Sequence, residues 1–155
     1  MLQIGDTIPD LTAPDQLGNP RKLRELLAKK GGIIYFYPKD NTPGCTLEAQ
    51  DFQLQSEALV TLGYTVIGVS RDSVASHANF CTRHQLAFTL LSDQENLLCE
   101  AFGVWQEKKN YGKVAMGIVR TTFITDAQGT IRKIYPKVKT KGHAEQVLSD
   151  LRTLC

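Results

Sequence analysis

The sequence predicts an α/β domain in which helices cover one central sheet, and three observations lead to this prediction. Short apolar runs at residues 33–37 and 65–70 flank a helix-forming stretch at residues 43–62, which is the order of a β–α–β unit. Further along, runs at 118–125 and 130–135 flank the turn Asp126-Ala-Gln-Gly129, which indicates a closing hairpin. The chain has 155 residues, of which 42% are hydrophobic and 22% charged, as is typical of a single globular domain spanning residues 1–155.

The first elements follow from local turn and periodicity signals. Residues 1–20 hold scattered apolar positions and a Gly18-Asn19-Pro20 turn, which predicts an N-terminal hairpin packed against the domain. A short helix is expected at about residues 22–29. Strands 33–37 and 65–70 should be parallel, because a crossover helix joins them. That helix is expected to bury the apolar face made of Leu47, Leu54, Ala58 and Leu62.

The second half of the chain continues to alternate strands and helices. Asp72 or Ser73 marks the start of one helix and Asp93 the start of another, since both residue types cap helix N-termini. A polar stretch containing Asn110-Tyr111-Gly112 indicates a loop. The expected elements are helix 73–84, strand 88–91, helix 95–102, loop 106–113, strands 118–125 and 130–135, and a last helix from about residue 142 to near the end.

A cysteine lies where strand 33–37 gives way to the long helix. Pro38 ends the strand. Thr42 is a good N-cap and Pro43 suits the first helical position, so Cys45 falls in the first helical turn. Open α/β sheets bind their ligands at the carboxyl ends of the strands, so Cys45 is a candidate reactive group.

A cysteine at this position needs a nearby cation if it is to react at neutral pH. A free cysteine has a pKa near ~8.5, and the thiolate is the nucleophile. Lowering the pKa to ~7 requires roughly 2 kcal/mol, whereas a helix N-terminus supplies only about 0.3–1 kcal/mol. We therefore expect a fixed cation beside Cys45. Gly44 is expected to let a substrate approach the backbone amides next to the sulfur.

The residues around Cys45 resemble a known active-site motif. Pro38-x-x-x-Thr42-x-x-Cys45 is similar to the motif of peroxiredoxins, and the run from Tyr37 to Glu48 (YPKDNTPGCTLE) resembles the PrxQ, or bacterioferritin comigratory protein, branch. The resemblance spans nearly the whole chain. It includes the segments 10–19, 88–93, 102–105 and 117–124.

This resemblance implies a thioredoxin-like sandwich, with a central mixed sheet flanked by helices. It also implies a thiol-dependent peroxidase that reduces hydrogen peroxide and organic hydroperoxides. Cys45 would be the peroxidatic cysteine, which becomes a sulfenic acid. The family's arginine maps onto Arg120, expected in the middle of strand 118–125, where it would hold the thiolate and the peroxide oxygens. Glu48 would orient Arg120, or else merely occupy the exposed helix face.

The remaining groups of the motif would act on the peroxide itself. Because the nucleophilicity of a thiolate falls with its pKa, a low pKa alone does not make a fast peroxidase. Further acceleration is expected from donors aimed at the O–O bond, namely the Thr42 hydroxyl and the amides of Gly44 and Cys45. Pro38 would shield the sulfur from water.

Cys81 is the candidate resolving cysteine, which would form a disulfide with Cys45. Many PrxQ relatives carry a second cysteine five residues after the first, but Gln50 occupies that position here. Other members use the following helix, where Cys81 lies. The alternative is that Cys81 is a small buried hydrophobe, because it shares a helix face with Val74 and Ala78.

Other cysteine and histidine residues are expected to have no part in catalysis. Cys99 lies among apolar helix residues and is expected to be structural, and Cys155 ends the chain. His77, Cys81 and His84 share a helix face with a spacing that could hold zinc, but no fourth ligand lies within sequence reach. The resemblance to peroxiredoxins implies a reaction without a metal or organic cofactor.

The resemblance further implies a monomer recycled by thioredoxin or a glutaredoxin-type dithiol reductant. The net charge of +2 is too small to indicate nucleic-acid binding. The lysines at Lys108-Lys109 and within residues 137–141 are interpreted as solvent-exposed faces. No targeting segment opens the chain and no run approaches the ~20 apolar residues of a membrane helix, so a cytoplasmic location without membrane contact is expected.

Two other functions stay open at this point. A general thiol–disulfide oxidoreductase would share the fold, but the chain has no C-x-x-C motif. A non-catalytic binding or holdase module of the same fold would consume no peroxide, whatever reductant was supplied.

Overall fold

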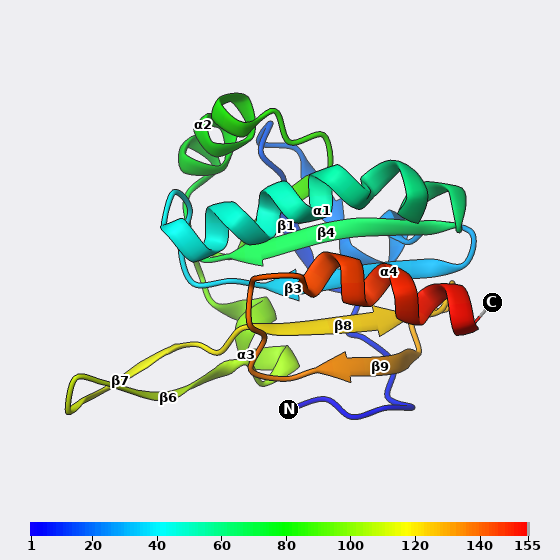
Figure 1. Cartoon of the computed structure of the whole chain (residues 1–155). Helices are drawn as coiled ribbons and strands as arrows, with labels where there is room; N and C mark the ends of the chain where they lie inside the picture. Colours follow the sequence, from blue (N-terminus) through cyan, green and yellow to red (C-terminus); the bar gives the residue numbers. More distant parts are fainter. Residues whose placement is uncertain (155) are drawn as a thin grey trace.

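A five-stranded mixed sheet lies at the centre of the protein (Figure 1). The computed structural model of the chain describes residues 1–154, and of Asn110 only the backbone. The strands run in the order β5-β4-β3-β8-β9, of which β3, β4 and β5 are parallel and β8 and β9 antiparallel to their neighbours. Their bounds are β3 Gly31–Phe36, β4 Tyr64–Ser70, β5 Thr89–Ser92, β8 Thr121–Thr125 and β9 Ile131–Tyr135. The predicted thioredoxin-like sandwich is confirmed.

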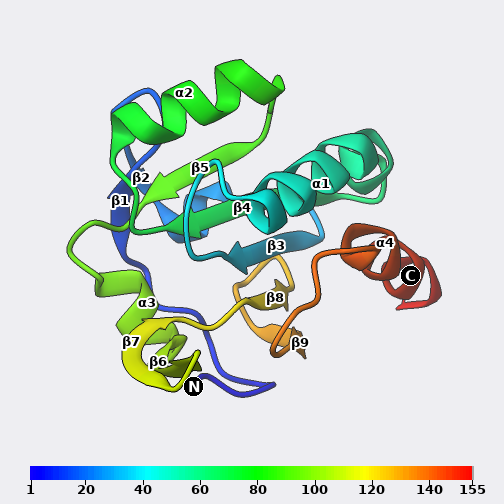
Figure 2. The same cartoon turned by 60° about the vertical axis from the view of Figure 1, so that its left-hand side comes forward.

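Helices cover both faces of this sheet (Figures 1 and 2). One face packs against α1 (Pro43–Thr61), α2 (Val74–His84) and α4 (His143–Leu154). The other packs against α3 (Leu97–Phe102), the short 3-10 helix η1 (Leu23–Leu26) and the N-terminal segment.

The central strand β3 is buried on both faces, as expected for a strand between two helical layers. Ile33 and Tyr35 belong to the cluster under α1 and α4, whereas Ile34 and Phe36 belong to the cluster over α3. Pro38 lies two residues beyond this strand, and the chain then turns into α1.

The N-terminal segment forms hydrogen bonds at both edges of the sheet. It contains the predicted hairpin, formed by β1 (Thr12–Pro14) and β2 (Pro20–Lys22). Between these strands, the Gln16 side chain donates to the Phe88 carbonyl at 3.3 Å and accepts from the Leu90 amide at 3.0 Å, on the outer side of β5. At the opposite edge, the Gly5 amide and the Asp6 carbonyl pair with Ile131 of β9, each at 2.8 Å. Both edge strands thus have hydrogen-bond partners.

The prediction of a loop at residues 106–113 is wrong. β6 (Trp105–Asn110) and β7 (Lys113–Ile118) form an antiparallel hairpin that projects from the body of the protein (Figure 1). Its tip is a two-residue turn in which Tyr111 and Gly112 have φ angles of 52° and 78°. The sequence predicts a loop because β6 is polar after Trp105 and so lacks the alternating apolar residues that identify a strand.

The predicted strand 118–125 is interrupted, so Arg120 does not lie in the middle of a strand. Val119 and Arg120 separate β7 from β8. Thr121 pairs with Phe36, the last residue of β3, so the two preceding residues have no strand beside them there. Instead, the Val119 amide bonds to the Val104 carbonyl and the Arg120 carbonyl accepts from the Val138 amide, both at 2.9 Å.

The predicted apolar face of helix α1 is only partly right. Leu47 and Leu54 are 39% and 76% exposed, whereas Ala58 and Leu62 are partly buried and pack against the core. The buried residues of the helix are Cys45, Glu48, Ala49, Phe52 and Leu59. Two of these, a cysteine and a glutamate, are not typical of an apolar stripe, which explains why the pattern missed the buried face in the first half of the helix.

Smaller corrections concern two short helices. The helix expected at residues 22–29 is only the 3-10 turn η1, because Lys22 still belongs to β2. Helix α3 begins two residues later than predicted, because Asn96 has a φ angle of 64°. The Asp93 carboxylate nevertheless accepts from the Leu98 and Cys99 amides and holds the start of α3. Within residues 1–154 no helix is both long and apolar enough to cross a membrane.

We expect Gly68→Ala to lower the free energy of unfolding by about 1–3 kcal/mol, because a Cβ there would overpack the core. It would lie 2.6 Å from Leu90 Cδ2 and 3.1 Å from the Tyr35 ring. Urea denaturation followed by circular dichroism measures the change. The control is Leu90→Ala, which should make Gly68→Ala less costly in the double variant. A Gly68→Ala protein as stable as the wild type would contradict this packing.

Candidate active site

Cys45 lies in the first turn of α1, just past the carboxyl end of β3. The helix begins at Pro43, after Thr42 in an extended conformation with φ −83° and ψ 152°, as the sequence predicts. Cys45 is only 1% exposed and forms no disulfide. The amides of the first helical turn have no carbonyl one turn earlier, so this end of α1 attracts negative charge.

The cation expected beside Cys45 is the guanidinium of Arg120. Its Nη2 lies 3.1 Å from Cys45 Sγ, and its Nη1 donates to Glu48 Oε1, also at 3.1 Å. The Arg120 side chain is 21% exposed and that of Glu48 only 1%. One guanidinium therefore bridges the sulfur and a buried carboxylate that follows one turn later on the same helix. Glu48 is not on an exposed face, which removes that alternative.

Gly44 provides the space for this guanidinium. A Cβ at position 44 would lie 3.0 Å from Arg120 Nη2, closer than side chains normally approach one another. The space left by the absent side chain was expected to admit substrate, whereas in the structure the Arg120 guanidinium lies beside it.

Thr42 occupies the N-cap position but does not act as a cap. Its hydroxyl donates to the Lys39 carbonyl at 2.8 Å and accepts nothing from the helix amides. The hydroxyl hydrogen is therefore already used. The expectation that Thr42 donates to a peroxide does not fit this geometry, although its oxygen can still accept a hydrogen bond.

Glu48 is an unusual carboxyl group because of its burial. Burial raises its pKa to about 7, even though the Arg120 charge acts in the opposite direction and Asp51 adds a smaller upward effect. Its Oε2 atom is buried and has no hydrogen-bond partner among the described residues. Glu48 consequently titrates close to neutral pH.

Sequence reasoning missed Lys108, which it assigned to a solvated face. Lys108 is half-buried on β6, and its Nζ donates to the Ile118 carbonyl at 2.8 Å. Burial and the neighbouring Arg120 charge lower its pKa, while Cys45 acts in the opposite direction. The hairpin thus brings a second cation into the electrostatic surroundings of Cys45. The alternation of residues along β6 could have revealed this only if the hairpin had been predicted.

The structure places Cys81 in the same apolar cluster as Cys45 but in a different electrostatic environment. Both cysteines belong to the apolar cluster between the sheet and α1, and Cys81 is 9% exposed. Burial, reinforced by the negative charge of Asp40, raises the pKa of Cys81 to about 11. It is therefore a protonated thiol in this fold. Pro38 is half-buried in the loop that leaves β3.

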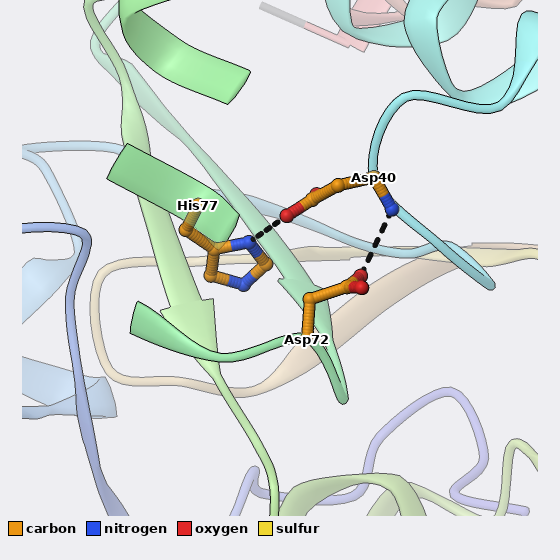
Figure 3. Close-up of side chains that lie close together, drawn as sticks. All are labelled: Asp40, Asp72 and His77. Carbon is orange, nitrogen blue, oxygen red and sulfur yellow. Dashed lines mark hydrogen bonds and ion pairs between the residues drawn. The ribbon is translucent and has the colours of Figure 1, made fainter. Parts of the chain in front are cut away.

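The zinc arrangement considered for α2 is not formed. Nδ1 of His77 faces Asp40 (Figure 3), and Nε2 faces the Leu91 carbonyl, so neither ring nitrogen is free to join Cys81 and His84 at a metal. The ligand atoms of Asp40, Asp72 and His77 do lie within 4.8 Å of one another, but each of these groups already has hydrogen-bond partners.

Cys99 lies in the opposite core, at the start of α3. It is fully buried, and burial raises its pKa. It packs with Leu98 and Phe102 in the cluster on that side of the sheet. This position agrees with a structural role. Cys155 lies outside the described residues.

The thioredoxin-like fold and a cysteine held by an arginine at a helix N-terminus define a class, the thiol-dependent peroxidases. Known proteins similar to this chain belong to one family. The AhpC/TSA family matches residues 4–134. The chain is 44% identical over 150 residues to a putative peroxiredoxin Bcp of Coxiella burnetii, covering 97% of this chain and 99% of that protein. It is also 44% identical over 153 residues to peroxiredoxin Bcp of Bacillus subtilis, covering 99% and 97%.

Solved structures give the same result. A PrxQ mutant of Xylella fastidiosa superposes with a TM-score of 0.93 at 37% identity, covering 99% of this chain and 98% of that one. The bacterioferritin comigratory protein of Xanthomonas campestris superposes with a TM-score of 0.89 at 40% identity, covering 98% and 99%. The chain belongs to the AhpC/TSA family and is a peroxiredoxin of the Bcp, or PrxQ, type.

We expect Glu48→Gln to remove a pH dependence of stability. The native pKa of Glu48, about 7, lies above the ordinary value of 4.5, so between these pH values the folded state binds a proton more tightly than the unfolded state. The free energy of unfolding of the wild type should thus fall, relative to Glu48→Gln, by on the order of 3 kcal/mol as pH rises through this interval.

Urea denaturation at several pH values from 4 to 8 measures this difference. Asp51→Asn serves as a control, because it keeps the buried carboxyl group and should retain most of the effect. If the wild type and Glu48→Gln gave parallel curves, Glu48 would not titrate in this range.

Proposed function

We propose that this protein reduces hydrogen peroxide and organic hydroperoxides at Cys45, with Arg120, Glu48, Thr42 and Pro38 forming the catalytic site. The observation that carries the proposal is the 3.1 Å contact between Arg120 Nη2 and Cys45 Sγ at the N-terminus of α1. A guanidinium and a helix N-terminus together can supply the charge stabilisation that neither supplies alone.

In the first step the Cys45 thiolate attacks one oxygen of the hydroperoxide. The S–O bond forms as the O–O bond breaks, Cys45 becomes a sulfenic acid, and the other oxygen leaves as water or an alcohol after gaining a proton. Arg120 and the amides of Gly44 and Cys45 stabilise the charge that develops on the leaving oxygen. Thr42, whose hydroxyl hydrogen bonds to Lys39, accepts a hydrogen bond from the hydroperoxide O–H.

Glu48 and Pro38 act on the surroundings of the sulfur. Glu48 orients the guanidinium through its 3.1 Å hydrogen bond with Nη1, and Pro38 shields Cys45 from water. An organic substrate class is supported by the Xanthomonas campestris relative, whose structures address its alkyl peroxide reduction activity.

In the second step Cys81 attacks the sulfenic sulfur, water leaves, and a Cys45–Cys81 disulfide forms. A disulfide needs Cα atoms about 4.4–6.8 Å apart. Cys45 and Cys81 are both helical and buried, so the first turn of α1 and part of α2 unwind before the bond closes. Thioredoxin or a glutaredoxin-type dithiol then reduces the disulfide.

The proposed enzyme works as a monomer in the cytoplasm. The groups around the sulfur all come from one chain, so no second copy is needed to complete the site. A cycle that ends in reduction by a dithiol requires a reducing compartment.

Cys45→Ser should abolish peroxide consumption, and Arg120→Ala should slow Cys45 oxidation by about 10²–10³-fold, since it removes a charged donor from the transition state. Stopped-flow mixing with hydrogen peroxide under single-turnover conditions measures the rate. The control is Arg132→Ala, which removes an exposed arginine paired with Asp126 and should leave the rate unchanged. Near-normal oxidation of the Arg120→Ala protein would refute the assignment.

Cys81→Ser should consume one equivalent of peroxide and then stop, leaving a Cys45 sulfenic acid that a dimedone-type reagent traps. Thioredoxin-driven turnover is expected to be lost, because no disulfide forms for the reductant to attack. Cys99→Ala should retain turnover, since Cys99 lies in the opposite core. Normal cycling of Cys81→Ser with thioredoxin would mean that another thiol resolves Cys45.

A further inference from the structure

A buried ion pair connects the segment that leads to Cys45 with the helix that carries Cys81. Asp40 lies in the loop before α1, five residues ahead of Cys45, and His77 lies in the first turn of α2, four residues ahead of Cys81. Their side chains are 1% and 0% exposed and meet at 2.6 Å (Figure 3). Neither residue belongs to the site around Arg120.

Each nitrogen of the His77 ring faces an oxygen atom. Nε2 lies 2.9 Å from the Leu91 carbonyl oxygen, which can only accept, so this nitrogen carries a hydrogen. Nδ1 faces Asp40 Oδ2, and the same carboxylate accepts from the hydroxyls of Tyr37 at 2.6 Å and Ser76 at 2.8 Å. Burial raises the pKa of Asp40, but its hydrogen bonds and the His77 charge outweigh burial and lower it. Both ring nitrogens thus have an acceptor within hydrogen-bond distance, which is the arrangement that an imidazolium paired with a carboxylate requires.

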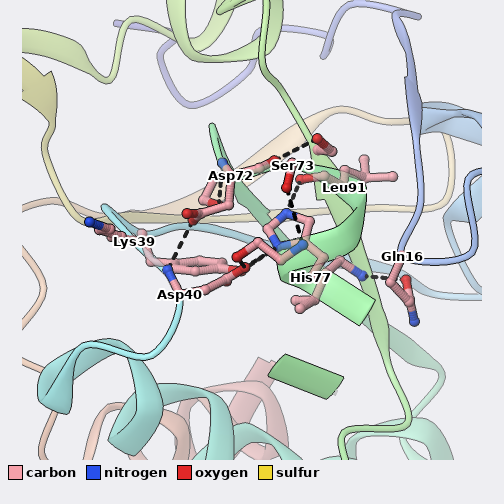
Figure 4. A network of polar contacts seen from close by, with 12 residues as sticks. Gln16, Lys39, Asp40, Asp72, Ser73, His77 and Leu91 are labelled. Carbon is pink, nitrogen blue, oxygen red and sulfur yellow. Dashed lines mark hydrogen bonds and ion pairs between the residues drawn. The ribbon is translucent and has the colours of Figure 1, made fainter. Parts of the chain in front are cut away.

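The pair is fastened to the carboxyl ends of the central strands (Figure 4). The Asp40 amide donates to Asp72 Oδ2 at 2.9 Å, and the same oxygen accepts from the Ser70 hydroxyl at 2.6 Å, at the end of β4. Ser73 caps α2 by accepting from the Ser76 amide. The loop before α1 and the first turn of α2 are thereby held together on the sheet.

Unwinding of the helical turn that holds either cysteine would pull the Asp40 and His77 side chains apart. In an α-helix the amide of Cys81 bonds to the carbonyl of His77, so unwinding the turn that holds Cys81 also frees the backbone of His77. On the other side, the first turn of α1 continues directly into the loop of Asp40. Separating a buried, hydrogen-bonded ion pair lowers the population of the open state by about two to three orders of magnitude. By comparison, the contact between Gln50 and His84 at the far end of α2 is exposed and 3.3 Å long.

We propose that the Asp40–His77 pair holds the fold closed around Cys45 and so determines how the sulfenic acid divides between two products. The inference rests on the proposed role of Cys81. In the closed fold, a second hydroperoxide transfers an oxygen to the Cys45 sulfenic acid, which becomes a sulfinic acid as water or an alcohol leaves. In the open fold the Cys81 sulfur attacks, the sulfenic hydroxyl leaves with the Cys81 proton as water, and the disulfide forms. Asp40 and His77 are thus positioning residues of the second step.

His77→Gln tests the proposal, because glutamine retains hydrogen-bond donors but not the charge. The reduced protein is mixed with hydrogen peroxide, quenched at intervals and analysed by mass spectrometry for sulfenic acid, disulfide and sulfinic acid. We expect the rate of sulfenic acid formation to stay within twofold of the wild type and disulfide closure to accelerate at least tenfold. About ten times more peroxide should be needed to convert half of Cys45 to sulfinic acid.

Two controls separate this effect from a loss of stability. His84→Gln changes the same residue type on the same helix outside the pair, and Leu98→Ala opens a cavity in the opposite core. Both should close the disulfide within twofold of the wild-type rate. If His77→Gln fails to fold, Tyr37→Phe removes one hydrogen bond to Asp40 while leaving the pair, and a smaller acceleration is expected.

Unchanged or slower closure in His77→Gln or, should that variant not fold, in Tyr37→Phe would overturn the inference, as would equal acceleration in Leu98→Ala. Peptide mapping of the oxidised wild type distinguishes this failure from that of the proposed function. A Cys45–Cys81 disulfide with an unchanged rate rejects only the role of the pair. A disulfide between Cys45 and another cysteine rejects the role of Cys81.

Discussion

The arrangement around Cys45 depends on one guanidinium shared by two acids. Arg120 contacts the sulfur with one nitrogen and Glu48 with another, and several features of the fold allow this. The break between β7 and β8 takes Arg120 out of the sheet, and Gly44 leaves room for it. Glu48 is buried with one oxygen unpaired, which costs stability. The chain thus gives up some stability to fix the cation at the sulfur, as is common where a site must be preorganised.

The two cysteines of the proposed cycle show how neighbouring charges divide roles within one core. Cys45 and Cys81 belong to the same apolar cluster, and both are nearly inaccessible to solvent. A cation lies against Cys45, whereas burial, reinforced by the charge of Asp40, raises the pKa of Cys81. The proposed difference in reactivity between the two sulfurs therefore does not require that one is more exposed to solvent than the other. In the proposed cycle, oxidation of Cys45 therefore comes before attack by Cys81, because Cys81 becomes a nucleophile only after it leaves its buried environment.

The sequence identified features that depend on local signals. The β–α–β unit, the start of α1 at Pro43 and the place of Cys45 follow from periodicity and helix-start residues within a short stretch of chain. The role of Arg120 came from family resemblance, and its position at a strand break could not be predicted, because the break depends on where the distant β3 ends. The Asp40–His77 pair was missed for a similar reason. The pair forms only when segments that follow separate strands come together in the fold. The position of a histidine on a helix face does not indicate which residue it will contact.

The N-terminal segment affects how readily the protein would aggregate while its helices are partly unwound. Gln16 covers one edge of the sheet, and Gly5 and Asp6 cover the other. An exposed edge strand can recruit another chain by strand addition, which is a common route to aggregation. In the proposed opening, the first turn of α1 and part of α2 unwind, while the hydrogen bonds to the sheet edges come from a segment outside both helices. The parts of β5 and β9 that this segment bonds therefore stay blocked to strand addition by a second molecule while the helices are open.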